Sequence, residues 1–567
     1  MTRLPTDGDG QDSVSEQASR FTLALNPLVG LRPEDVMQGA QAILKAMINE
    51  PAAAAAQLSD FVSELGKVAT GKSEVAPEQS DKRFADATWT DSRLHHGLLQ
   101  AYLAWGKALD GFVDKTSLSE IDKNRAHLFT TILVDALAPT NNFVSNPAAL
   151  RRIVDSGGQS LVSGMKNFIE DMTKNGGMPS QVDTSPFKVG ENLASTPGAV
   201  VFHNEILELI QYTPTTSSVR QRPVMITPPQ INKYYATDLA PGKSLVEFLL
   251  ASGMQTFCIS WRNPTSAHRE WGLDAYVSAL DEAVDAVREI TGSDDVTMMG
   301  SCSGGITSTA YLGYLAGTNQ PKVKNITLAV CVLDVASAED IALGSLITPQ
   351  TMAAAKKASE IRGVLDGNEL ARIFAWMRPN DLIWNYWVNN YLLGNKPPAF
   401  DILFWNADTT RLPARLHGDY IDLYFTNPFV NANKLMLNDV SIDLSQVKVD
   451  GYVLAGSTDH ITPWKSVFRT AQLIGEDTTF VLSSSGHLQS LINPPTNKKA
   501  TYWTGSMKGK TAEAFQAEGT KHNGTWWLHW RDWLYERSGA DVPAPSSLGS
   551  AAHPVTIPAP GSYVFDA

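Results

Sequence analysis

The sequence predicts an α/β protein preceded by a mostly helical region. After about residue 200, short apolar segments alternate with stretches of helical periodicity, a pattern typical of a parallel or mixed sheet with helical crossovers. Before that position, apolar residues recur at three- and four-residue spacing over long stretches, which predicts helices. A Gly-x-Cys-x-Gly turn between an apolar strand and a helix indicates that the sheet carries a functional site.

Composition narrows the class of protein. A chain of 567 residues, 43% hydrophobic and 19% charged, can bury a large core in several domains. A formal net charge of −13 without a long Lys/Arg run argues against a nucleic-acid partner. No stretch has the composition of a signal core or a membrane helix, and the three cysteines are sparse. We therefore expect a cytoplasmic protein without a transmembrane segment.

The N-terminal third divides into a tail and a helical domain. Residues 1–20 are rich in Asp, Gly, Ser and Gln, which predicts a disordered tail, and residues 21–200 form the helical domain. Because this domain carries no concentrated catalytic residues, its role is association with itself or a surface, or simply a helical layer packed on the next domain. Glycine-rich turns at 175–177 and 196–198 place the boundary near residue 200. Helices are expected over Pro33–Val68, Leu94–Leu137 and Ala148–Thr173.

Residues 201–567 form the predicted catalytic α/β domain. About 115 residues separate two consecutive strands within it, which is too long for a loop and predicts a helical cap inserted at about 335–448. The expected helices are Ser244–Ala251, Ala275–Ile290 and Ile306–Leu315. The expected strands are Ala199–Phe202, Leu207–Tyr212, Val224–Thr227, Gln255–Ser260, Val296–Met299, Ile326–Leu333, Gly451–Ala455 and Thr479–Leu482.

Three further stretches are notable for their composition. The insertion is rich in aromatic residues, among them Trp384, Trp387 and Tyr391, which either form the cap's own core or line a channel for an aliphatic substrate. The tryptophan-rich stretch Thr525–Leu534 predicts an amphipathic helix that closes the sheet domain. The Pro/Ala/Ser-rich tail from Val542 onward is expected to be loosely ordered.

Cys302 occupies the centre of a nucleophile-elbow pattern, where a hydrolase usually has serine. The elbow holds its central residue in a strained conformation, so that the side chain stands clear of the sheet. Gly300 and Gly304, two residues before and after, allow strand and helix to approach closely. The N-terminus of the following helix favours the thiolate. Taken alone, the turn is also compatible with a buried structural cysteine.

A cysteine nucleophile needs a base and an orienting acid, and two downstream loops supply them. Asp459 follows the strand Gly451–Ala455, and His487 follows the strand Thr479–Leu482. The order of nucleophile, acid and histidine, each just past the carboxyl end of a strand, is that of the α/β-hydrolase fold. The sequence therefore predicts a Cys302–Asp459–His487 triad.

Other residues compete for these roles. Asp334 also ends a strand and is an alternative acid, whereas His460, beside Asp459, is a candidate for a supporting position around the triad. Cys258 and Cys331 lie inside predicted strands, which indicates buried small apolar side chains.

The oxyanion formed by attack on a carbonyl needs backbone N–H donors. We expect one from Ser303, directly after the nucleophile, and the other from Ile231, in the loop after the strand Val224–Thr227.

Cysteine in place of serine shifts the expected chemistry toward acyl transfer. An acyl group on cysteine is a thioester, which retains the energy of an acyl-coenzyme A donor, so its transfer to a hydroxyl group runs downhill. The shift is modest, since hydrolases with cysteine at the elbow exist.

Six motifs together resemble the polyhydroxyalkanoate synthases, and the resemblance runs from about residue 20 to the C-terminal tail. They are Gly-Ser-Cys-Ser-Gly-Gly at 300–305, Pro-Pro-Gln-Ile-Asn-Lys-Tyr-Tyr at 228–235, Ser-Trp-Arg-Asn-Pro at 260–264, Trp-Met-Arg-Pro-Asn-Asp-Leu-Ile-Trp-Asn-Tyr-Trp at 376–387, Asp-His-Ile-Thr-Pro-Trp at 459–464 and Ser-Gly-His at 485–487. Three segments resemble class II synthases, which favour medium-chain monomers: residues 25–30, 175–182 and 526–530.

The resemblance implies an enzyme that polymerises (R)-3-hydroxyacyl-CoA into polyester and releases coenzyme A. His487 would deprotonate Cys302, which takes the acyl group, while Asp459 would orient His487 and help to activate the next 3-hydroxyl group. The resemblance further implies no metal or redox cofactor, a homodimer, and residence in the cytoplasm at the surface of a growing polymer granule.

Two other functions remain open at this point. The same triad would serve a thioesterase, an esterase or a depolymerase that uses water as acceptor, and the nature of the product distinguishes these from a polymerase. A granule-coating structural protein with a degenerate hydrolase domain is the alternative of another class, and the intact triad argues against it.

Overall fold

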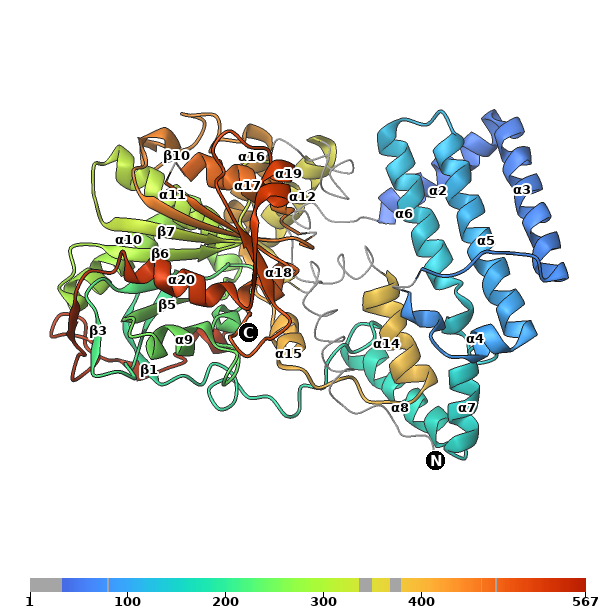
Figure 1. Cartoon of the computed structure of the whole chain (residues 1–567), viewed down its shortest axis with the longest axis horizontal. Coiled ribbons are helices and arrows are strands. Elements are labelled where there is room, and N and C mark those ends of the chain that lie inside the picture. The colour runs from blue at the N-terminus through green and yellow to red at the C-terminus, as the bar shows by residue number, and fades with distance from the viewer. Residues whose placement is uncertain (1–32, 79–80, 336–348, 368–378, 460, 475–476) are drawn as a thin grey trace.

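The computed structural model describes residues 33–78, 81–335, 349–367, 379–459, 461–474 and 477–567. A helical N-terminal region lies at one end of the molecule, and an α/β region built on one large sheet lies at the other (Figure 1). The predicted disordered tail, residues 1–20, falls outside the described residues.

The N-terminal region consists of helices, as predicted, but each predicted helix is two. Pro51 lacks an N–H and begins α3, the Ser119 side chain caps α6 by accepting from Asp122 N, and Gly158 has φ +85° just before α8. Within the described residues, none of the helices combines the length and apolar character needed to cross a membrane. The long helices are α2 (Pro33–Asn49), α3 (Pro51–Thr70), α5 (Arg93–Lys115), α6 (Glu120–Ala136), α7 (Pro147–Asp155) and α8 (Gln159–Lys174).

The α/β region is organised around an 11-stranded mixed sheet with the strand order β15-β14-β13-β12-β7-β6-β4-β5-β2-β1-β17. Its six central strands, from β13 to β5, run parallel, and the strands on both sides are antiparallel. The strands are β1 (Gly198–His203), β2 (Leu207–Tyr212), β4 (Val224–Thr227), β5 (Thr256–Trp261), β6 (Val296–Ser301), β7 (Val323–Ala329), β12 (Asp450–Gly456), β13 (Thr479–Ser483), β14 (Thr501–Thr504), β15 (Thr520–Asn523) and β17 (Ile557–Pro558).

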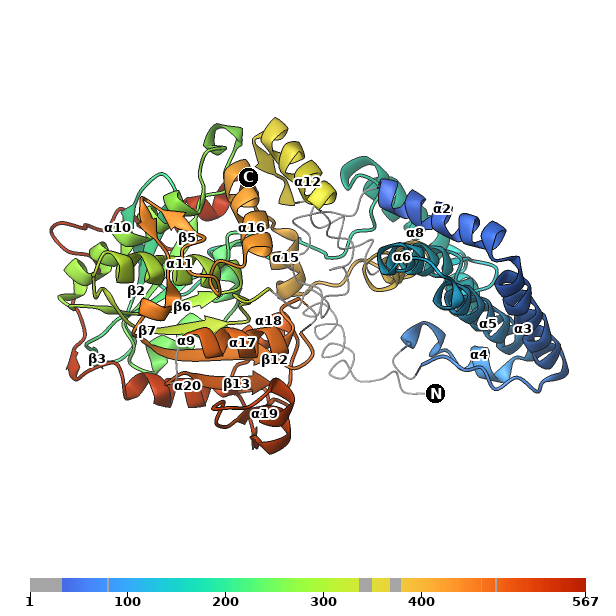
Figure 2. The ribbon, with the colours of Figure 1, turned by 90° about the horizontal axis from the view of Figure 1, so that it is seen from above.

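Helices cover both faces of this sheet and bury a separate apolar core on each (Figures 1 and 2). One face carries α10 (Leu273–Thr291), α11 (Ser303–Gly317) and α17 (Trp464–Ile474). The other carries α9 (Leu245–Ala251) and α20 (Trp526–Tyr535), whose tryptophans are almost fully buried. Near-continuous apolar strands are what a sheet covered on both faces requires. The fold is the predicted α/β class with a closing C-terminal helix.

Three peripheral strands of the large sheet, β14, β15 and β17, and the six strands of the small ladders were not predicted. The prediction of a loosely ordered tail is wrong. Residues from Val542 onward are not loose: β17 pairs with Val200 and Ala199 of β1, and Tyr563 is buried. Three two-stranded ladders complete the strands: β3 (Ser218–Arg220) with β16 (Asp541–Pro543), β8 (Val364–Leu365) with β9 (Leu412–Pro413), and β10 (Met436–Leu437) with β11 (Val440–Ser441).

The long insertion between β7 and β12 is helical, and its parts contact both regions. The helices α15 (Asp401–Ala407) and α16 (Ala414–Thr426) pack on the sheet region, while α12 (Pro349–Arg362) packs on α16. The aromatic rings of Trp387 and Tyr391 instead meet Phe168 of α8, at centroid distances of 6.1 and 5.3 Å. These rings also pack on one another, with Trp387 5.1 Å from Tyr391, as a core of the insertion would. The contact with the N-terminal helices was not predicted. Residues 336–348 and 368–378 of the insertion lie outside the described residues.

Candidate active site

Cys302 forms a strained elbow between β6 and α11. Its backbone has φ +49° and ψ −123°, a left-handed conformation that is costly for a residue with a Cβ. The neighbouring strand β7 fixes the backbone of Cys302, because Cys302 N donates a 3.0 Å hydrogen bond to Ala329 O. Its side chain is 6% exposed, so the thiol sits in a largely dry site.

The two glycines of the motif are required by this geometry. A Cβ on Gly300 would lie 2.7 Å from Gly305 Cα, and one on Gly304 would lie 2.3 Å from Thr227 O. Both contacts are with backbone atoms, which cannot move aside cheaply. The close approach of strand and helix predicted from the motif is therefore confirmed.

Asp459 and His487 follow β12 and β13, two neighbouring parallel strands, and lie at the same edge of the sheet as Cys302. Asp459 Oδ2 accepts a hydrogen bond from His487 Nδ1 at 2.7 Å. The other oxygen, Oδ1, accepts from the backbone N–H groups of Ile461 and Thr462 at 2.8 and 3.0 Å. Both side chains are buried, so the carboxylate is fixed and shielded from water.

The electrostatics of the pair favour a charged histidine. Burial alone lowers the pKa of His487, but the charge of Asp459, their hydrogen bond and the contact with the Cys302 side chain outweigh it and raise that pKa to about 10. Burial would raise the pKa of Asp459, yet the interaction with His487 and the hydrogen bonds from Thr462 lower it below its usual value. The structure thus brings Cys302, His487 and Asp459 together as an array that can accept a proton from the thiol.

Asp334, the alternative acid, contacts other residues than His487. Asp334 Oδ2 is 3.2 Å from Arg469 Nε, and Asp334 Oδ1 accepts from Asn427 Nδ2 at 2.9 Å. It is held by these groups rather than by His487. His460, predicted to support the triad, lies outside the described residues.

The two remaining cysteines are fully buried, as predicted. Burial raises the pKa of both the Cys258 and the Cys331 thiols, which keeps them unreactive. Cys331 packs behind the elbow: a Cβ on Gly305 would lie 2.7 Å from its Sγ. Among the described residues, no three His, Cys, Asp or Glu side chains gather as a metal-binding group.

The predicted oxyanion donors flank the elbow. Ser303 is the first residue of α11, where an N–H has no acceptor within the helix. Ile231 lies in the loop after β4, residues 228–233, which we call the oxyanion loop. Its carbonyl accepts from Thr410 N at 3.4 Å, and among the described residues its own N–H has no protein acceptor. Ser303 Oγ accepts a hydrogen bond from Gln230 N at 3.2 Å, which links the start of α11 to the residue before Ile231.

Sequence reasoning missed three residues that hold this site. Thr462 Oγ1 donates to Asp459 Oδ2 at 2.6 Å and lies 3.1 Å from His487 Nδ1. Gln230 donates to Thr307 Oγ1 at 2.9 Å and accepts from Tyr420 Oη at 3.0 Å, which joins the oxyanion loop to α11 and α16. Only Thr462 had a signal in the sequence, because a hydroxyl three residues after an aspartate is a common local cap.

The sheet order, the elbow after β6 and the carboxylate–imidazole pair after β12 and β13 define an enzyme of the α/β-hydrolase fold. Comparison with family models agrees: residues 233–494 match the model described as "alpha/beta hydrolase fold". Residues 80–249 match a second model, described as "Poly-beta-hydroxybutyrate polymerase (PhaC) N-terminus".

Curated relatives extend the match to nearly the whole chain. Poly(3-hydroxyalkanoate) polymerase 1 of Ectopseudomonas oleovorans is 50% identical over 98% of this chain and 99% of its own length. Polymerase 2 of the same organism is 46% identical over 95% of this chain and 96% of its own length. The poly(3-hydroxyalkanoate) polymerase subunit PhaC of Cupriavidus necator is 36% identical over 89% of this chain and 87% of its own length. The chain belongs to the poly(3-hydroxyalkanoate) polymerase family, as the sequence motifs predicted.

Proposed function

We propose that this protein polymerises (R)-3-hydroxyacyl-CoA into polyhydroxyalkanoate, with Cys302 carrying the acyl group as a thioester. The observation that supports this most is the buried array at the elbow, in which a strained cysteine contacts a histidine held 2.7 Å from a buried carboxylate. Membership of a polymerase family supports the same proposal. A cysteine nucleophile suits a polymerase, because a thioester intermediate retains the energy of the acyl-CoA donor.

In the first half-reaction, His487 takes the proton of the Cys302 thiol, and the thiolate attacks the thioester carbonyl of the substrate. The negative charge that develops on the carbonyl oxygen is accepted by the N–H groups of Ser303 and Ile231. The bond to the coenzyme A sulfur then breaks, and His487 returns its proton to that sulfur. Free coenzyme A leaves, and the acyl group stays on Cys302.

In the second half-reaction, the 3-hydroxyl group of another acyl unit gives its proton to His487 and attacks the Cys302 thioester. One ester bond forms, the Cys302–acyl bond breaks, and the thiol regains its proton. Asp459 holds His487 in the orientation that both transfers need. Every step is a proton transfer or an acyl transfer, so the proposed reaction needs no metal and no redox cofactor.

The monomer and the place of action are part of the same proposal. The resemblance of residues 25–30, 175–182 and 526–530 to class II synthases supports medium-chain monomers. Residence at polymer granules in the cytoplasm and a homodimer follow from the resemblance as well. A physical basis for granule contact is an apolar stripe of α8 whose side chains are 41–65% exposed: Leu161, Val162, Met165, Ile169 and Met172.

Replacing Cys302 tests the covalent step. Cys302→Ala is expected to abolish coenzyme A release while the thermal unfolding curve stays cooperative, because the substitution removes only the sulfur and keeps the Cβ and the backbone of the elbow. Mass spectrometry of the wild-type enzyme quenched after one turnover should add one acyl mass, on the peptide that contains residue 302. Normal coenzyme A release by the variant, or an acyl group on another residue, would refute the proposal.

A further inference from the structure

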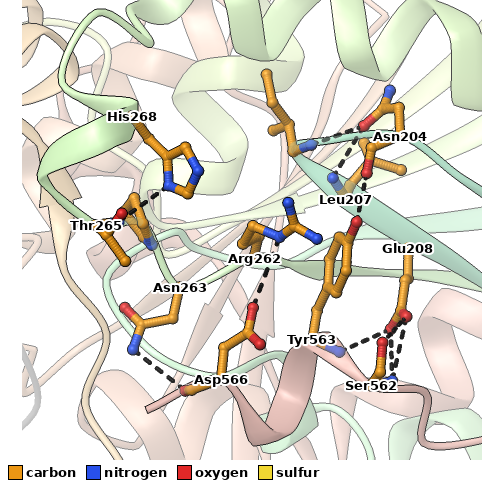
Figure 3. A network of polar contacts seen from close by, with 12 residues as sticks. Asn204, Leu207, Glu208, Arg262, Asn263, Thr265, His268, Ser562, Tyr563 and Asp566 are labelled. Carbon is orange, nitrogen blue, oxygen red and sulfur yellow. Dashed lines mark hydrogen bonds and ion pairs between the residues drawn. The ribbon is translucent and has the colours of Figure 1, made fainter.

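The C-terminal segment, residues 557–566, runs across the antiparallel side of the sheet and is held there by a polar network (Figure 3). After β17 pairs with β1, Glu208 Oε2 of β2 accepts from the backbone N–H groups of Ser562 and Tyr563 at 2.9 and 3.0 Å. Tyr563 Oη donates to Asn204 O at 2.6 Å. Glu208 is 3% exposed, so these bonds are made in a shielded place.

Two features show that the path of the segment is specified closely. Gly561 has φ +83°, a backbone conformation that favours glycine, and a Cβ there would also lie 2.3 Å from Glu208 Oε2. The Arg262 guanidinium stacks over the Tyr563 ring at 4.0 Å and lies 3.7 Å from Asp566 Oδ2.

The segment ends its path at the oxyanion loop. The carbonyl oxygen of Asp566 accepts from Lys233 Nζ at 2.6 Å and from Asn263 Nδ2 at 3.3 Å. Lys233 is the last residue of the oxyanion loop, two residues after Ile231, and is only 4% exposed. A buried ammonium group without an acceptor is costly, so the Asp566 carbonyl fixes where the Lys233 side chain can lie.

The insertion holds the same loop from another direction. Trp405 Nε1 donates to Lys233 O at 2.7 Å, and Thr410 Oγ1 donates to Gln230 O at 2.6 Å. Asn263 joins the two supports, because its Oδ1 accepts from Arg411 N at 2.9 Å while its amide group holds Asp566. The oxyanion loop is therefore fixed between the insertion and the C-terminal segment.

We propose that Lys233 is a positioning residue for acyl transfer, and that the C-terminal segment acts through it to hold the Ile231 N–H where the oxyanion develops. This inference rests on the proposed function. Electrostatic stabilisation of a transition state depends on donors fixed in advance, and a displacement of about 1 Å far from the reacting atoms can cost about a hundredfold in rate. Lys233 itself touches neither substrate nor nucleophile in this account.

The test compares two reactions of Cys302 in four proteins: wild type, Lys233→Met, a chain ended after Phe565, and the two changes combined. Coenzyme A release from (R)-3-hydroxydecanoyl-CoA forms an oxyanion, whereas alkylation by iodoacetamide at a saturated carbon does not. We expect kcat for release to fall about tenfold or more in each single variant, with KM within about twofold and the alkylation rate unchanged. The combined variant should fall no further than the single ones, because each change already removes the contact between Lys233 and Asp566 on which the inference rests.

The exposed Lys188, which pairs with Glu191 at 3.3 Å, supplies the matched control: Lys188→Met should leave both rates at the wild-type level. An unchanged kcat, an alkylation rate that falls in parallel, or losses that multiply in the combined variant would each overturn the inference. Should Lys233→Met fail to fold, the shortened chain decides alone, because it keeps the lysine. A wild-type protein that releases no coenzyme A would refute the proposed function instead, and the same comparison would then be made on the nitrophenolate burst from p-nitrophenyl acetate.

Discussion

At the scale of single residues, the proposed reactivity of Cys302 depends on how Asp459 is held. Its two oxygens receive hydrogen bonds from two backbone N–H groups, one hydroxyl and His487, so the carboxylate cannot turn away from the imidazole. This charge is a principal reason why the pKa of His487 rises to about 10. A raised pKa favours the imidazolium form of His487, which is the form that takes up the thiol proton in the proposed mechanism.

Asp459→Asn is expected to remove that charge and lower the pKa of His487. His487 then no longer holds a proton at neutral pH, and the rate of iodoacetamide alkylation of Cys302 at pH 7 should fall about tenfold. Near pH 10 the two rates should converge, because the wild-type His487, whose pKa is raised to about 10, also loses its proton there. The measurement is the pH profile of the alkylation rate. Equal rates for variant and wild type at pH 7 would contradict the proposed role of Asp459.

Asp334→Asn is the matched control for this change. Asp334 is another carboxylate at the end of a strand, but Arg469 and Asn427 hold it, so its loss should leave the alkylation profile unchanged.

Much of the site was predictable at this scale, because nucleophile, acid and base each follow a strand in a fixed order along the chain. Spacing could not show Gln230, Tyr420 or Lys233, since their partners lie 77 to 333 residues away in the sequence. Such contacts exist only once the sheet has assembled.

At the scale of elements, the elbow depends on the close approach of α11 to the end of β4. Gly304→Ala places a Cβ 2.3 Å from Thr227 O, at the end of β4, and 2.5 Å from Pro228 O, at the start of the oxyanion loop. The helix or the loop must shift, so we expect about 1–3 kcal/mol lower free energy of unfolding. Coenzyme A release should fall at least tenfold, because one oxyanion donor moves with the loop. Denaturant unfolding and steady-state kinetics measure the two effects.

Gly66 in α3 provides the opposite case, because no atom lies within 4 Å of a Cβ placed there. Gly66→Ala should raise the free energy of unfolding by about 0.5–1 kcal/mol, since alanine is the better helix former, and should leave coenzyme A release unchanged. Equal behaviour of the two variants would show that the elbow does not require the close approach.

Helices and strands with a strong apolar pattern were predicted well. Short strands that form only by pairing with distant segments were predicted poorly. The apolar strands β2 and β4 were predicted at their observed bounds. The strand β14 lies between β13 and β15 and is only four residues long, so its aromatic pair was too short a signal. The edge strand β15 is polar, and the edge strand β17 is two residues ending in proline.

At the scale of the whole molecule, α8 both packs on the insertion and carries the apolar stripe that we propose as the granule contact. One side of the helix packs on the insertion, where Asn167 Nδ2 donates to Asn390 O and Tyr391 Oη donates to Asp171 Oδ2. The other side presents the exposed apolar stripe. These long-range contacts, like the path of the C-terminal segment, could not be predicted from local composition.

Charged residues in that stripe test its proposed role. The double change Met165→Lys and Ile169→Lys is expected to reduce binding to polyester granules about tenfold or more, because an apolar contact is replaced by two charges that resist dehydration. Coenzyme A release in solution should stay at the wild-type rate. Sedimentation with granules measures the binding. Thr173→Lys on the same helix adds a charge without removing an apolar side chain and should bind normally; undiminished binding of the double variant would exclude the stripe as the granule contact.

The most direct test of the central claim is to incubate the purified protein with (R)-3-hydroxydecanoyl-CoA and follow free coenzyme A and product mass together. The account predicts coenzyme A release accompanied by polyester of high mass, with one coenzyme A for each monomer incorporated. Coenzyme A release with only free hydroxy acid as product would show that water is the acceptor, and the polymerase would have to be replaced by a thioesterase.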